Sequence, residues 1–243
     1  MTQRVEILNY HSDIEIMNKV RQNFIYAKDN FLDERINVIG AFYIGSANYG
    51  LDKAASDADI RLLVAPSITQ IALMAKPIST TFETPWGDHV EVKDVRMAMR
   101  EISKQNINAV EILLTPYKII EDNYKILWYI LEKDAETFCR INPYNFVNSV
   151  YGVLHQWIQK PVTEKTKERI VFYYEALVKY INNYPMKECI TFTGPVTEEY
   201  LKDIVNFKLD NPYENKYDAE RLSMLNKWTE TILYASWWKG EFD

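Results

Sequence analysis

Two aspartates, Asp57 and Asp59, stand immediately before an apolar run over residues 60–65. That run is rich in aliphatic residues and predicts a buried strand. Because residues two apart on a strand face the same way, both carboxylates point to one side. Paired carboxylates repel each other unless a cation lies between them, and Mg²⁺ is the oxygen-seeking cation usually found with phosphates. The pair therefore predicts a divalent-cation site beside a phosphate.

A glycine-serine pair, Gly45-Ser46, follows a second apolar run over residues 36–44. Glycine is scarce, with seven in 243 residues, yet Gly40, Gly45 and Gly50 fall within one short segment. A glycine takes tight turns that other residues resist, and it lets backbone N–H groups approach an anion. The Ser46 hydroxyl adds another donor. This segment predicts a turn that contacts phosphate.

The combined pattern resembles the signature of the nucleotidyltransferases of the DNA polymerase β superfamily, and most of all the predicted nucleotidyltransferases of bacteria and their phages. The resemblance covers residues 36–180 and rests on two segments, Gly45-Ser46-x-x-Tyr49-Gly50-Leu51 and Ser56-Asp57-x-Asp59-Ile60. Residues 104–114 are also similar to that subfamily, in which an Asn opens a helix that carries a Glu before a Leu pair. Here those residues are Asn106, Glu111 and Leu113-Leu114.

The resemblance implies a third carboxylate on a neighbouring strand, and two residues compete for that place. Glu91 lies between Val90 and Val92 in a predicted strand over 88–93 and best fits the family pattern, although the family more often has Asp there. Asp94 precedes a predicted helix, where an aspartate is typical of an N-cap. We therefore expect Glu91 to be the third metal ligand and Asp94 to cap the helix.

Two basic residues open a predicted helix over 163–184. Lys165 matches a lysine that faces the nucleotide in the family, and Arg169 stands about where the family has a histidine. A solvated basic turn is the alternative interpretation. If the functional one holds, these side chains neutralise triphosphate charge. The expected nucleotide-binding residues are therefore Gly45, Ser46, Ser56, Lys165 and Arg169.

The resemblance implies a metal-dependent enzyme that moves a nucleoside monophosphate from an NTP such as ATP to an acceptor hydroxyl and releases pyrophosphate. Asp57, Asp59 and Glu91 would hold Mg²⁺ or Mn²⁺ for an in-line displacement. The sequence does not identify the acceptor, which in the superfamily is RNA, a protein or a small molecule. The alternative is a catalytically impaired relative that binds a nucleotide or a partner.

The expected fold is α+β, with a small mixed sheet and its helices over residues 1–120 and a helical domain over 121–243. Apolar periodicity and turn residues predict these elements. The expected strands cover 37–44, 59–65, 79–84 and 88–93. The expected helices cover 12–32, 67–75, 94–104, 106–115, 122–139, 143–160, 163–184, 197–207 and 215–239.

Composition predicts a cytoplasmic protein without a membrane span. No stretch approaches the roughly 18 apolar residues of a transmembrane helix, and the first residues lack the apolar core of a signal peptide. Cys139 and Cys189 are the only cysteines, so we expect free, buried thiols. A formal net charge of −6 argues against a protein that coats nucleic acid through a global positive field, and it leaves room for a local basic patch.

Overall fold

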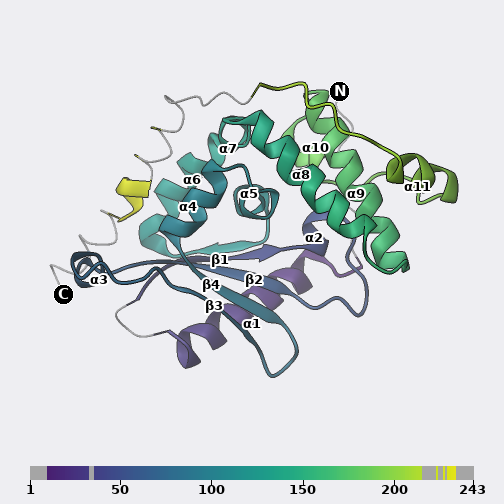
Figure 1. Cartoon of the computed structure of the whole chain (residues 1–243). Coiled ribbons are helices and arrows are strands. Elements are labelled where there is room, and N and C mark those ends of the chain that lie inside the picture. The colour runs from purple at the N-terminus through teal and green to yellow at the C-terminus, as the bar shows by residue number, and fades with distance from the viewer. Residues whose placement is uncertain (1–9, 33–35, 215–222, 224–226, 228, 234–243) are drawn as a thin grey trace.

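The computed structural model describes residues 10–32, 36–214, 223, 227 and 229–233, and these form an α+β fold. Its centre is a five-stranded mixed sheet in the order β3-β4-β2-β1-β5 (Figure 1). The β2–β4 pair is parallel, whereas the other three neighbouring pairs are antiparallel. The strands are β1 (Asn37–Ile44), β2 (Asp59–Ala65), β3 (Ser79–Glu83), β4 (His89–Asp94) and β5 (Lys118–Ile120).

Helix α1 (Asp13–Asn30) covers one face of the sheet (Figure 1). It begins at a capping box in which Ser12 and Glu15 bond each other's backbone, which satisfies two otherwise orphaned N–H groups. Its buried side chains recur every three or four residues, so one stripe faces the strands. Ile16, Val20 and Phe24 join an apolar cluster with alternate residues of β2 and β4.

Helices α4 to α11 gather on the opposite side of the sheet, whereas α3 lies beyond one edge of it (Figure 1). One apolar cluster contains Ile39 and Leu63 from the sheet together with side chains from α4 to α11. It includes residues on both sides of residue 120, and the division into two domains stays a prediction. The helices are α2 (Ser46–Tyr49), α3 (Ile68–Ala72), α4 (Val95–Ser103), α5 (Ile107–Leu114), η1 (Asp122–Tyr124), α6 (Lys125–Lys133), α7 (Ala135–Phe138), α8 (Pro143–Ile158), α9 (Glu164–Ile181), α10 (Met186–Cys189) and α11 (Glu198–Val205).

The β2–β4 register decides which side chains lie beside each other. Asp59 pairs with His89, and Arg61 pairs with Glu91. Val90 and Val92 belong to the apolar cluster that packs against α1. His89, Glu91 and Lys93 therefore share the opposite face of the strand, as the alternation predicted. Asp59 and Arg61 of β2 therefore lie on the same face of the sheet as His89 and Glu91 of β4, the face away from α1.

Most predicted elements are confirmed to within a few residues. The single helix expected over 122–139 is instead the 3-10 turn η1, which runs directly into α6, followed after Asp134 by α7. Strand β5 and helix α10 were not predicted, and the helix expected over 215–239 lies mostly outside the described residues. Cys139 and Cys189 are free and buried, as expected. Across the described ranges, every helix is too short or too polar to span a bilayer.

Candidate functional site

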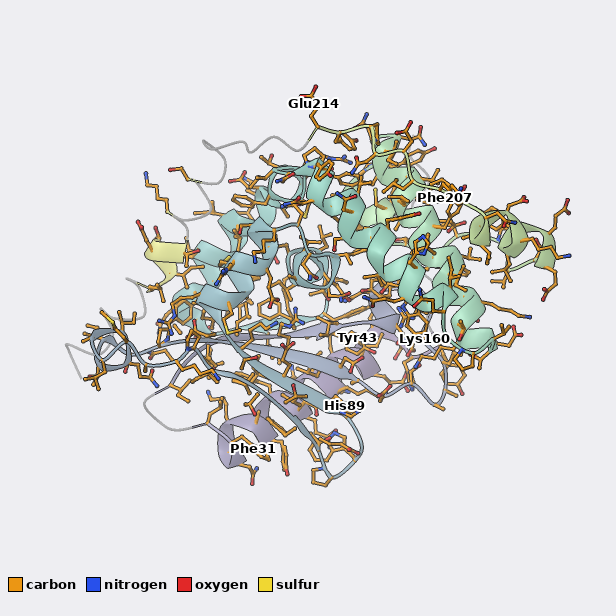
Figure 2. All side chains as sticks on the ribbon, viewed as in Figure 1. Phe31, Tyr43, His89, Lys160, Phe207 and Glu214 are labelled. Atoms are coloured by element: carbon orange, nitrogen blue, oxygen red, sulfur yellow. The ribbon has the colours of Figure 1, made fainter. Side chains whose placement is uncertain are left out.

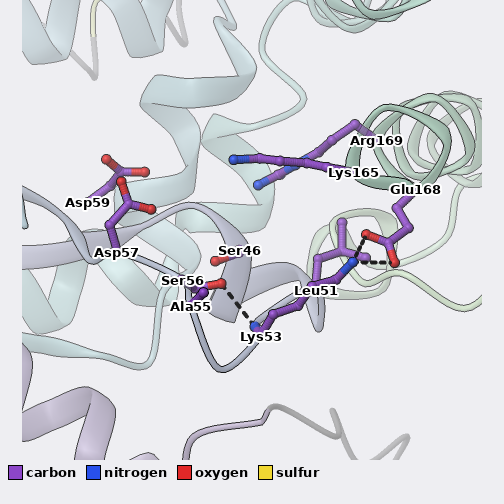
Figure 3. Close-up of a pocket in the computed structure, with 10 residues that line it drawn as sticks. All are labelled: Ser46, Leu51, Lys53, Ala55, Ser56, Asp57, Asp59, Lys165, Glu168 and Arg169. Carbon is purple, nitrogen blue, oxygen red and sulfur yellow. Dashed lines mark hydrogen bonds and ion pairs between the residues drawn. The ribbon is translucent and has the colours of Figure 1, made fainter. Parts of the chain in front are cut away.

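A cavity opens between one end of the sheet and α9 (Figure 3). We call its two sides the sheet wall, formed by residues 46–59, and the helical wall, formed by α9. Its volume of about 180 Å³ is below the roughly 300–1,000 Å³ of most small-molecule pockets, and so suits part of a ligand. The lining residues are Ser46, Leu51, Lys53, Ala55, Ser56, Asp57, Asp59, Lys165, Glu168 and Arg169.

The sheet wall carries the two predicted carboxylates. Asp59 is the first residue of β2, and Asp57 lies in the loop before it with its side chain half exposed. Burial raises the pKa of Asp59, and the charge of Asp57 raises it further, although His89, Arg169 and Lys165 act in the opposite direction. The structure thus brings Asp57 and Asp59 together in a position where a cation would relieve their repulsion.

Asp88, a buried carboxylate, fixes the loop that carries Asp57. One carboxylate oxygen accepts the backbone N–H of Ala58 at 2.8 Å. The other accepts the Asn23 amide at 2.8 Å and the Trp86 indole N–H at 3.0 Å. Hydrogen bonds from these three donors hold the residue between the two aspartates against α1 and the β3–β4 turn.

Gly45 occupies a backbone conformation that other residues rarely adopt, with φ 100° and ψ −142°. A Cβ at this position would lie 3.2 Å from Oδ2 of Asp59, so the glycine also keeps space beside that carboxylate. Its backbone N–H donates to Oε1 of Glu111 at 2.5 Å. This N–H is therefore bonded within the protein, and Gly45 contributes its conformation and small size to the cavity.

The two predicted serines line the cavity from the sheet wall. Ser46 is the first residue of α2, directly after the Gly45 turn. Ser56 is held in a short turn in which its hydroxyl accepts the backbone N–H of Lys53 at 2.9 Å. The Ser56 hydroxyl keeps a proton that it can donate, whereas the Ser46 side chain hydrogen-bonds the Tyr43 side chain.

The helical wall carries the two predicted cations. Lys165 and Arg169 lie one turn apart on α9, and Figure 3 shows both side chains reaching toward Asp57 and Asp59. The Arg169 guanidinium also lies 5.2 Å from the centroid of the Tyr49 ring. Within the described ranges, neither cation forms a hydrogen bond or an ion pair. Their charge is available to an anion in the cavity.

Lys53 and Glu168 join the two walls beside this charge. Lys53 lies in the loop after α2, Glu168 lies on α9, and their charged atoms are 2.8 Å apart. Because Glu168 is neutralised by this lysine, it subtracts little from the positive charge of the helical wall.

Glu91, the expected third ligand, does not line the cavity. Its carboxylate bonds Nε of Arg61 at 2.7 Å and Nζ of Lys93 at 2.9 Å, and these two cations lower its pKa against the effect of burial. The position beside Asp59 is occupied by His89, whose Nε2 lies 3.6 Å from Oδ2 of Asp57. In the described part of the chain, no three His, Cys, Asp or Glu side chains are grouped so that they could hold a metal ion.

Asp94 has the role expected of it, since it caps α4 by accepting the backbone N–H of Arg96. Sequence reasoning did not assign functions to Glu111, Asp88 or His89. Glu111 is a lone carboxylate among Val110, Ile112 and Leu113 on an apolar helix. A buried carboxylate must be hydrogen-bonded or paired, and this pattern therefore indicates that Glu111 has polar partners. Figure 2 shows His89 on the sheet, and its position beside Asp59 follows from the register between β2 and β4, which the sequence does not give.

Comparisons with known proteins provide little further information. No protein-family model matches the chain, and no curated protein matches it. The chain is similar to the crystal structure of a nucleotidyltransferase-like protein from Exiguobacterium sibiricum 255-15, with 11% identity over 91% of this chain and 77% of that one. The TM-score is 0.30, which is too low to support a conclusion about fold or activity.

Proposed function

We propose that this protein binds a nucleoside triphosphate with its phosphates in the cavity and transfers the nucleoside monophosphate to an acceptor hydroxyl. The observation that carries the proposal is that Asp57 and Asp59 on one wall face Lys165 and Arg169 on the other, two cations that form no ion pair with a described residue. A divalent cation would relieve the repulsion between the two carboxylates, and phosphate oxygens would pair with the two side-chain cations. This combination matches a metal-bound polyphosphate. The small volume suits phosphates better than a whole nucleotide.

The residues present fit one divalent cation and not a set of three carboxylates. Asp57 and Asp59 are hard oxygen donors, and phosphate oxygens would complete the coordination of Mg²⁺ or Mn²⁺. Glu91 is left out of this proposed set because Arg61 and Lys93 already occupy its carboxylate. When bound, the ion would neutralise phosphate charge and polarise the phosphoryl group under attack. No step is assigned to a second ion.

The chain's own residues would act mainly by positioning and by charge. Lys165 and Arg169 would bind the β- and γ-phosphates and stabilise the charge that develops on pyrophosphate as it leaves. Ser46 would donate its hydroxyl to a phosphate oxygen. The acceptor oxygen would form a bond to the α-phosphorus as its proton passes to solvent water, while the bond from the α-phosphorus to the bridging oxygen breaks and pyrophosphate leaves. Transfer then requires correct alignment of the two reactants within the site.

A second candidate function is nucleotide binding without transfer. It is favoured by one observation, which is that His89, rather than a carboxylate, lies beside Asp59. An imidazole there adds no negative charge to the pair. A protein of this kind would bind the metal-bound triphosphate but would turn it over slowly or not at all.

The two candidates are separated by measuring binding and transfer on the same protein. Titration calorimetry with Mg²⁺ and each of the four NTPs, with adenosine as the matched ligand lacking phosphate, tests binding. Incubation with α-labelled NTPs and separate pools of RNA, protein and small hydroxyl compounds tests transfer. Binding with transfer supports the enzyme, and binding alone supports the second candidate. Absence of Mg²⁺-dependent NTP binding would exclude both.

A further inference from the structure

Glu111 is a buried carboxylate in the middle of α5, and its side chain forms no ion pair with any of the described residues. It is 3% exposed, and its neighbours on the helix are apolar. Burial raises its pKa, while hydrogen bonds from Tyr49, Asn48 and Gly45 act to lower it. Such a group is costly to bury unless its oxygens are bonded. The hydrogen bonds to its oxygens therefore have to offset the cost of burying this group.

All three hydrogen bonds to Glu111 come from one short segment, residues 45–49. Oε1 accepts the backbone N–H of Gly45 at 2.5 Å and the Asn48 amide at 2.6 Å. Oε2 accepts the Tyr49 hydroxyl at 2.5 Å. This segment turns β1 into α2 and places Ser46 in the cavity. One carboxylate thus fixes both ends of the turn.

Tyr49 extends this connection to the helical wall. Its ring centroid lies 4.3 Å from that of Phe172 on α9, and Arg169 lies over the same ring. Its carbonyl accepts the backbone N–H of Phe192 at 2.8 Å. The phenol is therefore held by Glu111 at its hydroxyl and by the helical part of the chain at its ring and backbone.

We propose that Glu111 is the positioning residue of the cavity, because its carboxylate sets the Gly45–Tyr49 turn on the sheet wall and, through Tyr49, the Arg169 guanidinium on the helical wall. The consequence for binding rests on the function proposed above. Glu111 does not touch the nucleotide in this arrangement. It acts by fixing groups that contact phosphate from both sides.

The binding test compares MgATP with adenosine by titration calorimetry. Glu111→Ala should weaken MgATP binding by about tenfold or more, while adenosine binding changes little. Glu111→Gln should restore most of the affinity, because its amide oxygen still accepts from Gly45 and Asn48 and its NH₂ group can donate to Tyr49. Tyr49→Phe, which removes only the Oε2 contact, should give a loss of about threefold and serves where Glu111→Ala does not fold.

Gln105→Ala is the matched control, since Gln105 is also a buried polar residue that bonds backbone, here the carbonyls of Ile102 and Phe138. It should lower stability without changing the ratio of MgATP to adenosine affinity. A wild-type ratio in both Glu111→Ala and Tyr49→Phe would overturn the proposal. So would the same loss of ratio in Gln105→Ala, because it would show a general effect of destabilisation.

Hydrogen exchange on the nucleotide-free protein tests the positioning separately. In Glu111→Ala, amides over residues 45–50 and those near Arg169 should exchange faster than in wild type, whereas Gln105→Ala should change neither region. Wild-type protection of residues 45–50 in Glu111→Ala would overturn the inference. If wild type binds no NTP but the exchange result holds, the proposed function fails and the positioning of the turn stands.

Discussion

The sheet wall and the helical wall of the cavity hold their charged groups by different means. On the sheet wall, strand register places Asp59, Asp88 holds the backbone beside Asp57, and Glu111 bonds the Gly45 turn. On the helical wall, Lys165 and Arg169 extend long side chains from α9, and one of them rests on an aromatic ring. The first wall is fixed through backbone and buried acids, whereas the second supplies charge on flexible stems. Substitutions on the sheet wall should therefore cause large losses of MgATP binding or transfer, and substitutions on the helical wall should cause smaller losses.

The largest effect is expected at Asp59. Asp59→Ala should reduce transfer below detection, because the proposed ion loses a ligand. Unfolding temperature without Mg²⁺ should hold or rise, because the substitution removes a carboxylate whose pKa is raised by burial and by Asp57. A labelled-NTP assay and thermal unfolding measure the two effects. The exposed Asp29→Ala on α1 is the control, and full transfer by Asp59→Ala would exclude the metal assignment.

The next effect is expected at Gly45. Gly45→Val should abolish MgATP binding and lower the free energy of unfolding by about 1–3 kcal/mol, because valine is strained at this φ and its Cβ crowds Asp59. Chemical denaturation and calorimetry measure the two losses. Gly152 is a helical glycine with open space where a Cβ would lie, so Gly152→Ala should instead be neutral or stabilising by about 0.5–1 kcal/mol. Wild-type affinity in Gly45→Val would show that the turn does not serve the ligand.

Smaller and graded losses are expected on the helical wall. Lys165→Ala and Arg169→Ala should each weaken MgATP binding by about three- to tenfold, and the losses should shrink as salt is raised. Adenosine binding should not change. Lys187→Ala, which removes an exposed lysine outside the cavity, is the charge-matched control. If the Lys165 and Arg169 variants match this control at low salt, the basic turn is only a solvated surface.

The smallest effect on activity is expected at Glu91. Glu91→Gln should leave transfer within about twofold and lower the free energy of unfolding by about 1–3 kcal/mol, because Arg61 and Lys93 lose a charged partner in a mostly buried network. Kinetics and denaturation separate the two results. Loss of transfer with unchanged stability would restore Glu91 as a metal ligand.

Local features of this fold could be predicted from the sequence. The bounds of β1 and β2 follow from apolar runs, and the caps at Asp94, Asn106 and Thr163 follow from residue type and position. Such features depend on neighbours within a few residues. Strand β5 could not be predicted, because its three residues are too few to show a period and their pairing with β1 is long-range.

Part of the candidate site could also be predicted, because its motifs depend on residues close together in the sequence. Asp57, Asp59, Lys165 and Arg169 could be chosen from motifs, and the structure brings them to one cavity, while their roles stay predictions. Alternation indicated which face Glu91 occupies, but not that His89 pairs with Asp59, since pairing between separate strands is set by the whole sheet. A lone carboxylate on an apolar helix indicates that Glu111 needs partners, but not which ones, because its contacts join residues more than 60 positions apart.

The apolar cluster that joins the sheet to the helices has a consequence for how this protein can change. Tyr49 and Leu51 of the sheet wall share that cluster with Phe172 of the helical wall, so both walls pack on one continuous apolar core. A movement of α9 away from the sheet would expose apolar side chains of both walls to water. Opening of the cavity is therefore thermodynamically linked to partial unfolding, and entry of the proposed ligand should depend on small local displacements of the walls.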